Sequence, residues 1–223
     1  MSLLWGRWIW AGLVLSAVGI VALALAYNGA PFNVDQAVMD WVFANRSDAL
    51  TPHVHVISEL FGPELVTMWT IVIAVVLACR DRTAYRAVTV LAAVVSAGVV
   101  TETLKLIVSR PRPPMAYHLA TEEITHSFPS GHATGTSALA FTTAIVATVG
   151  ARREVRRLAI VMAVLITAMV AGTRLYLGVH WVTDVAAGAA IGVVAALLVP
   201  DVINAGLNLL QRQVPGRLPA WVD

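Results

Sequence analysis

Six apolar runs, each close to 20 residues long, constrain the fold of this chain more than any other feature. They lie at residues 8–27, 61–79, 87–108, 132–150, 157–177 and 181–205. An α-helix needs about 20 apolar residues to cross a bilayer. Only 13% of the residues are charged, against about 25% in an ordinary soluble domain. The sequence therefore predicts an all-α, polytopic membrane protein with about six transmembrane helices.

The segments between these runs are too short for a separate globular domain, so residues 1–223 are expected to form a single membrane-embedded domain. The first run follows Arg7 and contains Ala22-Leu23-Ala24, which resembles a signal-peptide cleavage site. It is longer than the roughly 7–15-residue apolar region of a signal peptide, which favours an uncleaved first span. The net charge is only +2 and no basic stripe is present, which argues against a nucleic-acid partner. Nothing in the sequence indicates an oligomeric state.

The arginines predict how the chain is oriented. In a six-span arrangement, three arginine-containing segments fall on one side of the membrane: Arg80, Arg82 and Arg86; Arg152, Arg153, Arg156 and Arg157; and Arg212 and Arg217. The positive-inside rule makes this side, with both termini, cytoplasmic. Residues 28–60, 109–131 and the turn 177–181 then lie outside the plasma or inner cell membrane.

Three short polar stretches fall on the predicted extracytoplasmic side. They read Lys105-x6-Arg112-Pro113, Pro129-Ser130-Gly131-His132 and Arg174-x5-His180-x3-Asp184. Ionisable residues inside a membrane are costly and are usually functional. The active site is therefore expected at the extracytoplasmic ends of the helices.

His180 and Asp184 are four residues apart at the start of the last run, so they share one helix face. A carboxylate that takes the Nδ1 proton leaves the imidazole Nε2 free to act as a nucleophile. The alternative is a His–Asp pair that only satisfies two polar groups. Gly188 and Gly192 continue the same row and would let a neighbouring helix approach closely.

Ser130, Gly131 and His132 stand where the fourth run begins. The first N–H groups of a helix have no internal partners and can bind an anion. His132 would lie beside that anion and could protonate a leaving oxygen. The alternative makes Ser130 an ordinary N-cap. That alternative does not explain why a histidine stands at position 132.

Lys105, Arg112 and Arg174 are candidate phosphate ligands. Arginine can bind two phosphate oxygens at once, and lysine acts as a point charge. Snorkelling to lipid headgroups would account for any one of these cations. For Arg110, snorkelling and a role in the site explain the residue equally well. Snorkelling does not explain all three candidate ligands, because Lys105 is the only lysine in the chain. Glu102, one turn earlier, is placed to pair with Lys105.

These residue types fit phosphoryl transfer. The cations and the helix terminus would stabilise the phosphoryl oxygens, each donor contributing about 3 kcal/mol. His180 would attack phosphorus, and His132 would protonate the departing oxygen and then activate water. No carboxylate cluster suited to Mg²⁺ is evident, so neither a metal nor another cofactor is expected. His53 and His55 are two residues apart and do not share a helix face, so we interpret them as interfacial histidines.

At these residues the chain resembles the type-2 phosphatidate phosphatase superfamily of integral-membrane lipid phosphatases. The family pattern K-x6-RP, PSGH and SR-x5-H-x3-D falls within residues 105–184, with Thr173 where serine is usual. The resemblance implies His180 as nucleophile, Asp184 as its partner and His132 as acid/base. It implies that the phosphate is held by Lys105, Arg112, Ser130, Gly131 and Arg174.

The expected reaction is hydrolysis of a lipid phosphate headgroup through a phosphohistidine intermediate. The outward site favours a polyprenyl diphosphate, a carrier recycled in envelope synthesis, giving polyprenyl phosphate and inorganic phosphate. Phosphatidylglycerol phosphate, phosphatidate and other phosphorylated polyprenyl lipids stay open as substrates. The rival class is a non-hydrolytic lipid transporter or binding protein, which would need the cations but not both histidines.

Overall fold

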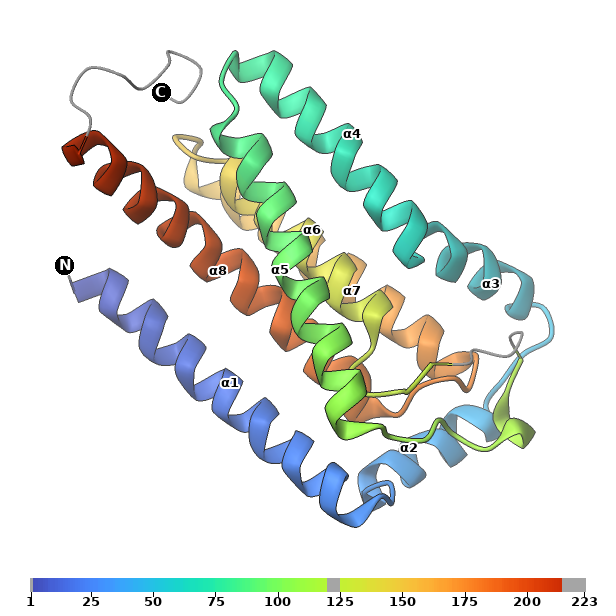
Figure 1. The fold of residues 1–223 in the computed structure, drawn as a ribbon. Coiled ribbons are helices and arrows are strands. Elements are labelled where there is room, and N and C mark those ends of the chain that lie inside the picture. The colour runs from blue at the N-terminus through green and yellow to red at the C-terminus, as the bar shows by residue number, and fades with distance from the viewer. Residues whose placement is uncertain (1, 120–124, 214–223) are drawn as a thin grey trace.

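The computed structural model describes residues 2–119 and 125–213, and these residues form helices and loops without a β-strand. The helices are α1 (Ser2–Asn28), α2 (Asn33–Ala44), α3 (Thr51–Leu60), α4 (Pro63–Asp81), α5 (Tyr85–Val108), α6 (Gly131–Ala147), α7 (Arg153–Tyr176) and α8 (Val182–Gln213), with a short 3₁₀ helix at Met115–Tyr117. Figure 1 shows the long helices running side by side, with α2 across one end of the bundle. The predicted all-α membrane fold is confirmed.

The membrane-spanning helices follow the predicted runs with two differences. Within the described residues, α1, α4, α5, α7 and α8 are each long and apolar enough to cross a membrane. The fourth predicted span, 132–150, is a helix of only 17 residues because α6 ends at Ala147. The last one extends past its predicted end, since α8 continues through Pro200 to Gln213.

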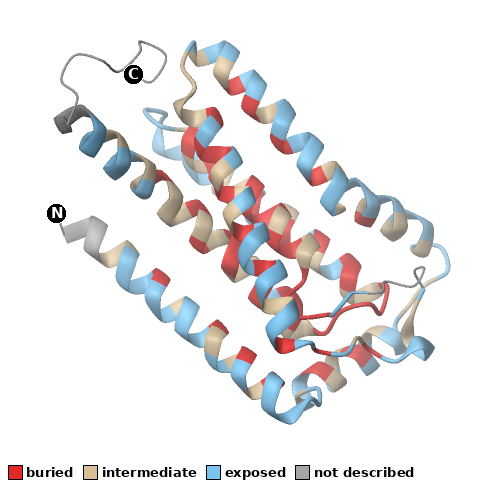
Figure 2. Ribbon diagram, in the orientation of Figure 1, coloured by how far each residue is buried: buried red, intermediate tan, exposed pale blue. Residues whose placement is uncertain are grey.

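Helix α6 lies at the centre of the bundle, packed against α5, α7 and α8 (Figure 2). Two glycines of α8 allow the closest of these approaches. A Cβ on Gly188 would lie 2.5 Å from the carbonyl oxygen of Ser130, and one on Gly192 would collide with the Ser137 hydroxyl. The predicted role of Gly188 and Gly192 is confirmed, and their contact fixes α8 against the start of α6.

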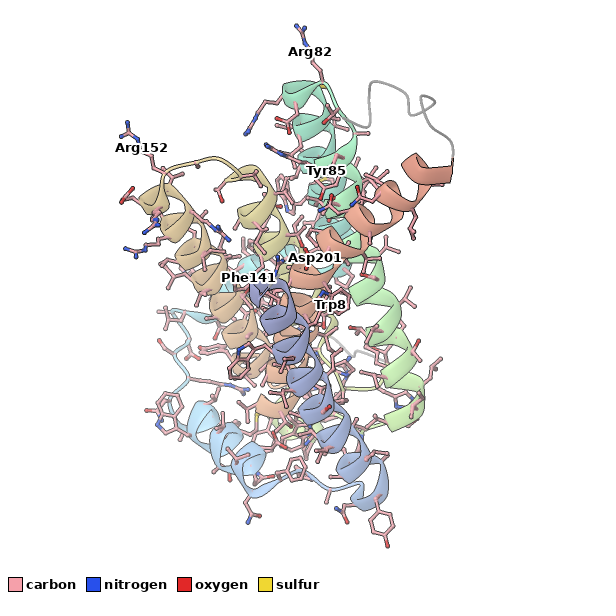
Figure 3. The ribbon with its side chains drawn as sticks, turned by 90° about the vertical axis from the view of Figure 1, so that its left-hand side faces the viewer. Trp8, Arg82, Tyr85, Phe141, Arg152 and Asp201 are labelled. Carbon is pink, nitrogen blue, oxygen red and sulfur yellow. The ribbon has the colours of Figure 1, made fainter. Side chains whose placement is uncertain are left out.

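Both arginine-rich turns project from the same end of the bundle. Figure 3 shows Arg82 and Arg152 at the end opposite α2. Near this end Arg7 joins α1 to α8, because its guanidinium donates to the Leu197 carbonyl at 2.6 Å and lies 3.4 Å from the Asp201 carboxylate. The remaining polar stretches therefore gather at the other end, beside α2.

Adding one methyl group at Gly192 should destabilise the bundle. The new Cβ would lie 2.6 Å from backbone atoms of Thr134 and Ala138, and overpacking of this kind costs about 1–3 kcal/mol. Gly206→Ala on the same helix is the matched control, because nothing lies within 4 Å of a Cβ there. Thermal unfolding in detergent should show a lower midpoint for Gly192→Ala than for Gly206→Ala. Equal midpoints would contradict the close packing of α6 on α8.

Candidate active site

The turn between α7 and α8 brings His180 and Asp184 into the interior. Gly178 has a φ of +72°, and a Cβ there would collide with the carbonyl oxygen of Tyr117, so this turn requires glycine. His180 and Asp184 are both buried. The His180 Nδ1 lies 3.5 Å from the Asp184 Oδ2, facing it at a distance longer than a normal hydrogen bond.

The environment keeps the His180 imidazole neutral at neutral pH. Burial lowers the pKa of His180 to about 3, although the Asp184 carboxylate acts in the opposite direction. A neutral imidazole has a free lone pair, which a nucleophile requires.

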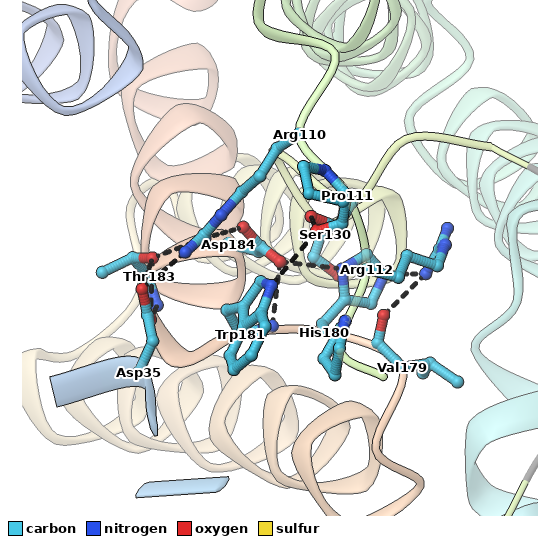
Figure 4. A network of polar contacts seen from close by, with 12 residues as sticks. Asp35, Arg110, Pro111, Arg112, Ser130, Val179, His180, Trp181, Thr183 and Asp184 are labelled. Atoms are coloured by element: carbon cyan, nitrogen blue, oxygen red, sulfur yellow. Dashed lines mark hydrogen bonds and ion pairs between the residues drawn. The ribbon is translucent and has the colours of Figure 1, made fainter. Parts of the chain in front are cut away.

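Arg110 makes the most enclosed polar network of the structure's described part. Its guanidinium lies 2.5 Å from Asp184 Oδ1 and 2.6 Å from Asp35 Oδ2, and only 1% of the residue is exposed (Figure 4). It also donates to the Thr183 hydroxyl at 2.8 Å and lies over the Trp181 ring. Of the two alternatives left open for Arg110, snorkelling is wrong, because both its ion-pair partners lie in the interior.

Asp35, on the first turn of α2, completes this network. Its carboxylate accepts hydrogen bonds from the backbone N–H of Thr183 at 3.0 Å and from the Thr183 hydroxyl at 2.8 Å. It also accepts one from the backbone N–H of Phe32. From the sequence, Asp35 was only one residue of the predicted outer segment 28–60. The available signal was an acidic residue in the first turn of a short helix, together with a second arginine two residues before the motif arginine Arg112.

Arg112 reaches the other face of His180. Its Nη1 lies 3.2 Å from the His180 Nε2 and donates to the Val179 carbonyl at 2.8 Å (Figure 4). The Arg112 Nε donates to the backbone carbonyl of Thr125, and its Nη2 donates to the Thr125 hydroxyl. Burial lowers the pKa of Arg112 to about 10, against the opposing effect of Asp184, so this guanidinium is still positively charged at neutral pH.

The start of α6 faces the same space. Ser130 occupies the N-cap position, but its hydroxyl makes no capping hydrogen bond. This hydroxyl is buried and has no hydrogen-bond partner within the described residues. Its backbone N–H donates to the Asp184 carbonyl at 3.0 Å, which ties α6 to α8. The alternative of an ordinary N-cap serine is therefore wrong, and the hydroxyl is available for a ligand.

Lys105, Arg174 and His132 border this space from three helices. The predicted Lys105–Glu102 pair is present, with Nζ and Oε1 2.9 Å apart, and a Cβ on Gly131 would lie 3.7 Å from that Nζ. The buried Arg174 donates to the Ser58 hydroxyl at 2.7 Å. Together with His132 it lines an open cavity of about 730 Å³ under α3.

All eight predicted site residues thus lie at one end of the bundle, around the start of α6. In the described residues, no three His, Cys, Asp or Glu side chains form a group suited to a metal ion. His53 binds the Ala49 carbonyl on the surface, and His55 lines the open cavity.

A family model described as the PAP2 superfamily matches residues 86–206, more than half of the chain. The chain belongs to the PAP2 superfamily. It is an integral-membrane lipid phosphatase, as the three motifs predicted.

Two solved structures share the fold. One is described as the first transmembrane PAP2-type phosphatidylglycerolphosphate phosphatase from Bacillus subtilis. It has a TM-score of 0.74 and 23% identity, with 85% of this chain and 96% of that chain covered. The other is Aquifex aeolicus LpxE, with a TM-score of 0.57, 21% identity, and 76% and 96% coverage. A comparison with curated proteins gave no sequence match.

Removing the Arg110 charge should destabilise the protein more than removing that of Asp35. Arg110→Met leaves two buried carboxylates unpaired, and breaking a buried pair costs about 3–5 kcal/mol. Asp35→Asn keeps a polar group beside Arg110 and leaves Asp184 paired. Thermal unfolding in detergent should rank wild type above Asp35→Asn, and Asp35→Asn above Arg110→Met. The reverse order of the two variants would contradict the central position of Arg110.

The His180 imidazole should stay neutral at pH values where ordinary histidines are charged. With a pKa of about 3, it should remain unprotonated at pH 5, where an imidazole of pKa about 6.5 is mostly protonated. Nitrogen NMR of histidine-labelled protein should show a non-titrating imidazole, whose signal is missing in His180→Asn. A His180 signal that titrates near pH 6.5 would contradict the buried environment.

Proposed function

We propose that this phosphatase hydrolyses a lipid phosphate through a phosphohistidine on His180, at the extracytoplasmic face of the membrane. The observation that carries the proposal is the gathering of two histidines, three cations and an unpartnered hydroxyl around the start of α6. A partly buried cluster of that composition stabilises the charge that develops on phosphoryl oxygens. The proposed roles are those that the motifs predicted.

In the first step, the Nε2 lone pair of His180 forms a bond to phosphorus, and the bond from phosphorus to the leaving oxygen breaks. His132 gives its proton to that oxygen. Arg112 is already beside Nε2, at 3.2 Å, so a phosphoryl group reaching this nitrogen meets the guanidinium. Lys105, Arg174, Ser130 and the N–H groups at the start of α6 supply the other donors.

In the second step, water attacks phosphorus while His132 takes its proton. The phosphorus–nitrogen bond breaks, its electrons return to Nε2, and inorganic phosphate leaves. Asp184 faces Nδ1 throughout and stabilises the positive charge that the imidazole carries in the intermediate. Arg110 and the backbone N–H of Trp181 hold this carboxylate in place, the latter at 2.8 Å. The residues provide the acid, base and charge stabilisation, so we propose a metal-independent reaction.

The proposed substrate is a polyprenyl diphosphate, cleaved to polyprenyl phosphate and inorganic phosphate. An outward-facing site supports a carrier lipid that is released outside the cell. Phosphatidylglycerol phosphate is the second candidate, because a structurally similar protein is described as a phosphatase for that lipid. Release of phosphate from both lipids and from phosphatidate, compared at equal surface concentration, ranks the candidates.

Replacing the proposed nucleophile should abolish turnover without unfolding the protein. His180→Asn should lower kcat for phosphate release from a polyprenyl diphosphate by about a thousandfold or more. His53→Asn is the matched control, since His53 is exposed and bonds only to the Ala49 carbonyl. Wild-type activity in His180→Asn would rule out the proposed nucleophile. Loss of activity with EDTA and its recovery with Mg²⁺ would rule out the metal-independent mechanism.

The arginine-rich turns support the proposed orientation, because Arg82 and Arg152 lie together at the end opposite α2. In a Cys79→Ala background, a cysteine at the exposed Asp48 should react with a membrane-impermeant maleimide in right-side-out vesicles. A cysteine at the exposed Ala151, beside Arg152, should react only after permeabilisation. The opposite labelling pattern would place the site on the cytoplasmic side.

A further inference from the structure

An apolar groove of about 500 Å³ lies between α4 and α7, with α6 as its floor. Its walls and floor include Trp69 and Ile73 of α4, Leu139 and Ala144 of α6, and Met162 and Ile166 of α7. Among the residues that the structure describes, no charged side chain lines this groove. A groove of this mainly apolar composition accepts a hydrocarbon chain and has no charge with which to bind a phosphate.

The floor of the groove is the face of α6 that carries His132. Thr136, Ala140, Thr143 and Ala147 line the groove and follow His132 at spacings of three or four residues, so all five lie on one side of the helix. From His132 to Ala147 this row is about 22 Å long, at 1.5 Å per residue.

The end of the groove nearest the candidate active site meets His132 at the turn between α3 and α4. Leu60 and Phe61 line the groove there. At the next residue, Gly62, a Cβ would lie only 3.7 Å from the His132 Nε2. The groove therefore begins beside the imidazole that lines the open cavity under α3.

We propose that the groove between α4 and α7 holds the hydrocarbon chain of the substrate lipid. The proposal rests on the proposed function, in which His132 protonates the leaving oxygen. The chain is joined to that oxygen, directly or through the second phosphate of a diphosphate, so it departs from the His132 side. The row of small side chains that follows His132 along α6 leaves space for this chain.

A second groove, between α4 and α5, is the competing location. Its volume is about 300 Å³, and Lys105 and Glu102 lie among its lining residues. Charged groups at its mouth suit the phosphoryl oxygens or water better than a hydrocarbon chain. This second groove also meets α6 on another face, which carries Gly131, Thr134 and Gly135 and not the row of small residues that follows His132.

Substitutions that fill each groove test this assignment. Ala140→Phe fills the first groove about 12 Å along α6 from His132, and Ala147→Phe fills the end of the groove farthest from His132. Gly98→Phe is the matched control, because Gly98 lines the second groove and has open space around its Cβ position. Phosphate release is measured with a long-chain polyprenyl diphosphate and with a single-isoprene diphosphate, whose chain is too short to reach Ala140.

Ala140→Phe should lower kcat/KM for the long-chain substrate by about tenfold or more and leave the short one within about twofold. Ala147→Phe should show the same selectivity, more weakly, and Gly98→Phe should show none. Long-chain loss confined to Gly98→Phe, or equal effects on both substrates in both alanine variants, overturns the assignment. Wild-type protein that releases phosphate from neither substrate overturns the proposed function instead.

Discussion

The guanidinium of Arg110 lies between two buried carboxylates, Asp35 and Asp184, and the arrangement of the site depends on this ion-pair network. An unpaired charge in such an interior costs several kcal/mol, so the three groups are stable only together. Because Asp35 belongs to α2, Arg110 to the loop after α5 and Asp184 to α8, their pairing joins three distant parts of the chain. It also fixes Asp184 opposite the Nδ1 of His180.

Two further contacts position the start of α6 relative to Asp184. The Ser130 N–H binds the Asp184 carbonyl, and the glycine at 188 lets the start of α6 approach α8 without a side chain between them. The unpartnered Ser130 hydroxyl, His132 and the N–H groups of α6 thereby face the same space as His180. The proposed chemistry needs this placement, since a nucleophile, an acid and oxyanion donors must reach one phosphoryl group.

The sequence predicted the parts of this molecule that depend on local pattern. Apolar runs gave the long helices, and the spacing of His180 and Asp184 gave their shared helix face. The Arg110–Asp35 pair escaped prediction because it joins residues 75 positions apart, and a buried arginine looks the same in sequence as one at a lipid headgroup. The groove between α4 and α7 could not be predicted from the sequence either, because alanine and threonine line tightly packed helix faces as readily as faces that border a groove.

The central claim is that phosphate passes through a covalent bond to His180, and trapping that intermediate tests it most directly. The wild-type protein is mixed with a polyprenyl diphosphate carrying a radioactive terminal phosphate, stopped in alkali within one turnover, and digested into peptides. The account predicts label on the peptide containing His180, at a histidine nitrogen. Label on a different residue, or label-free protein while phosphate is being released, would contradict it.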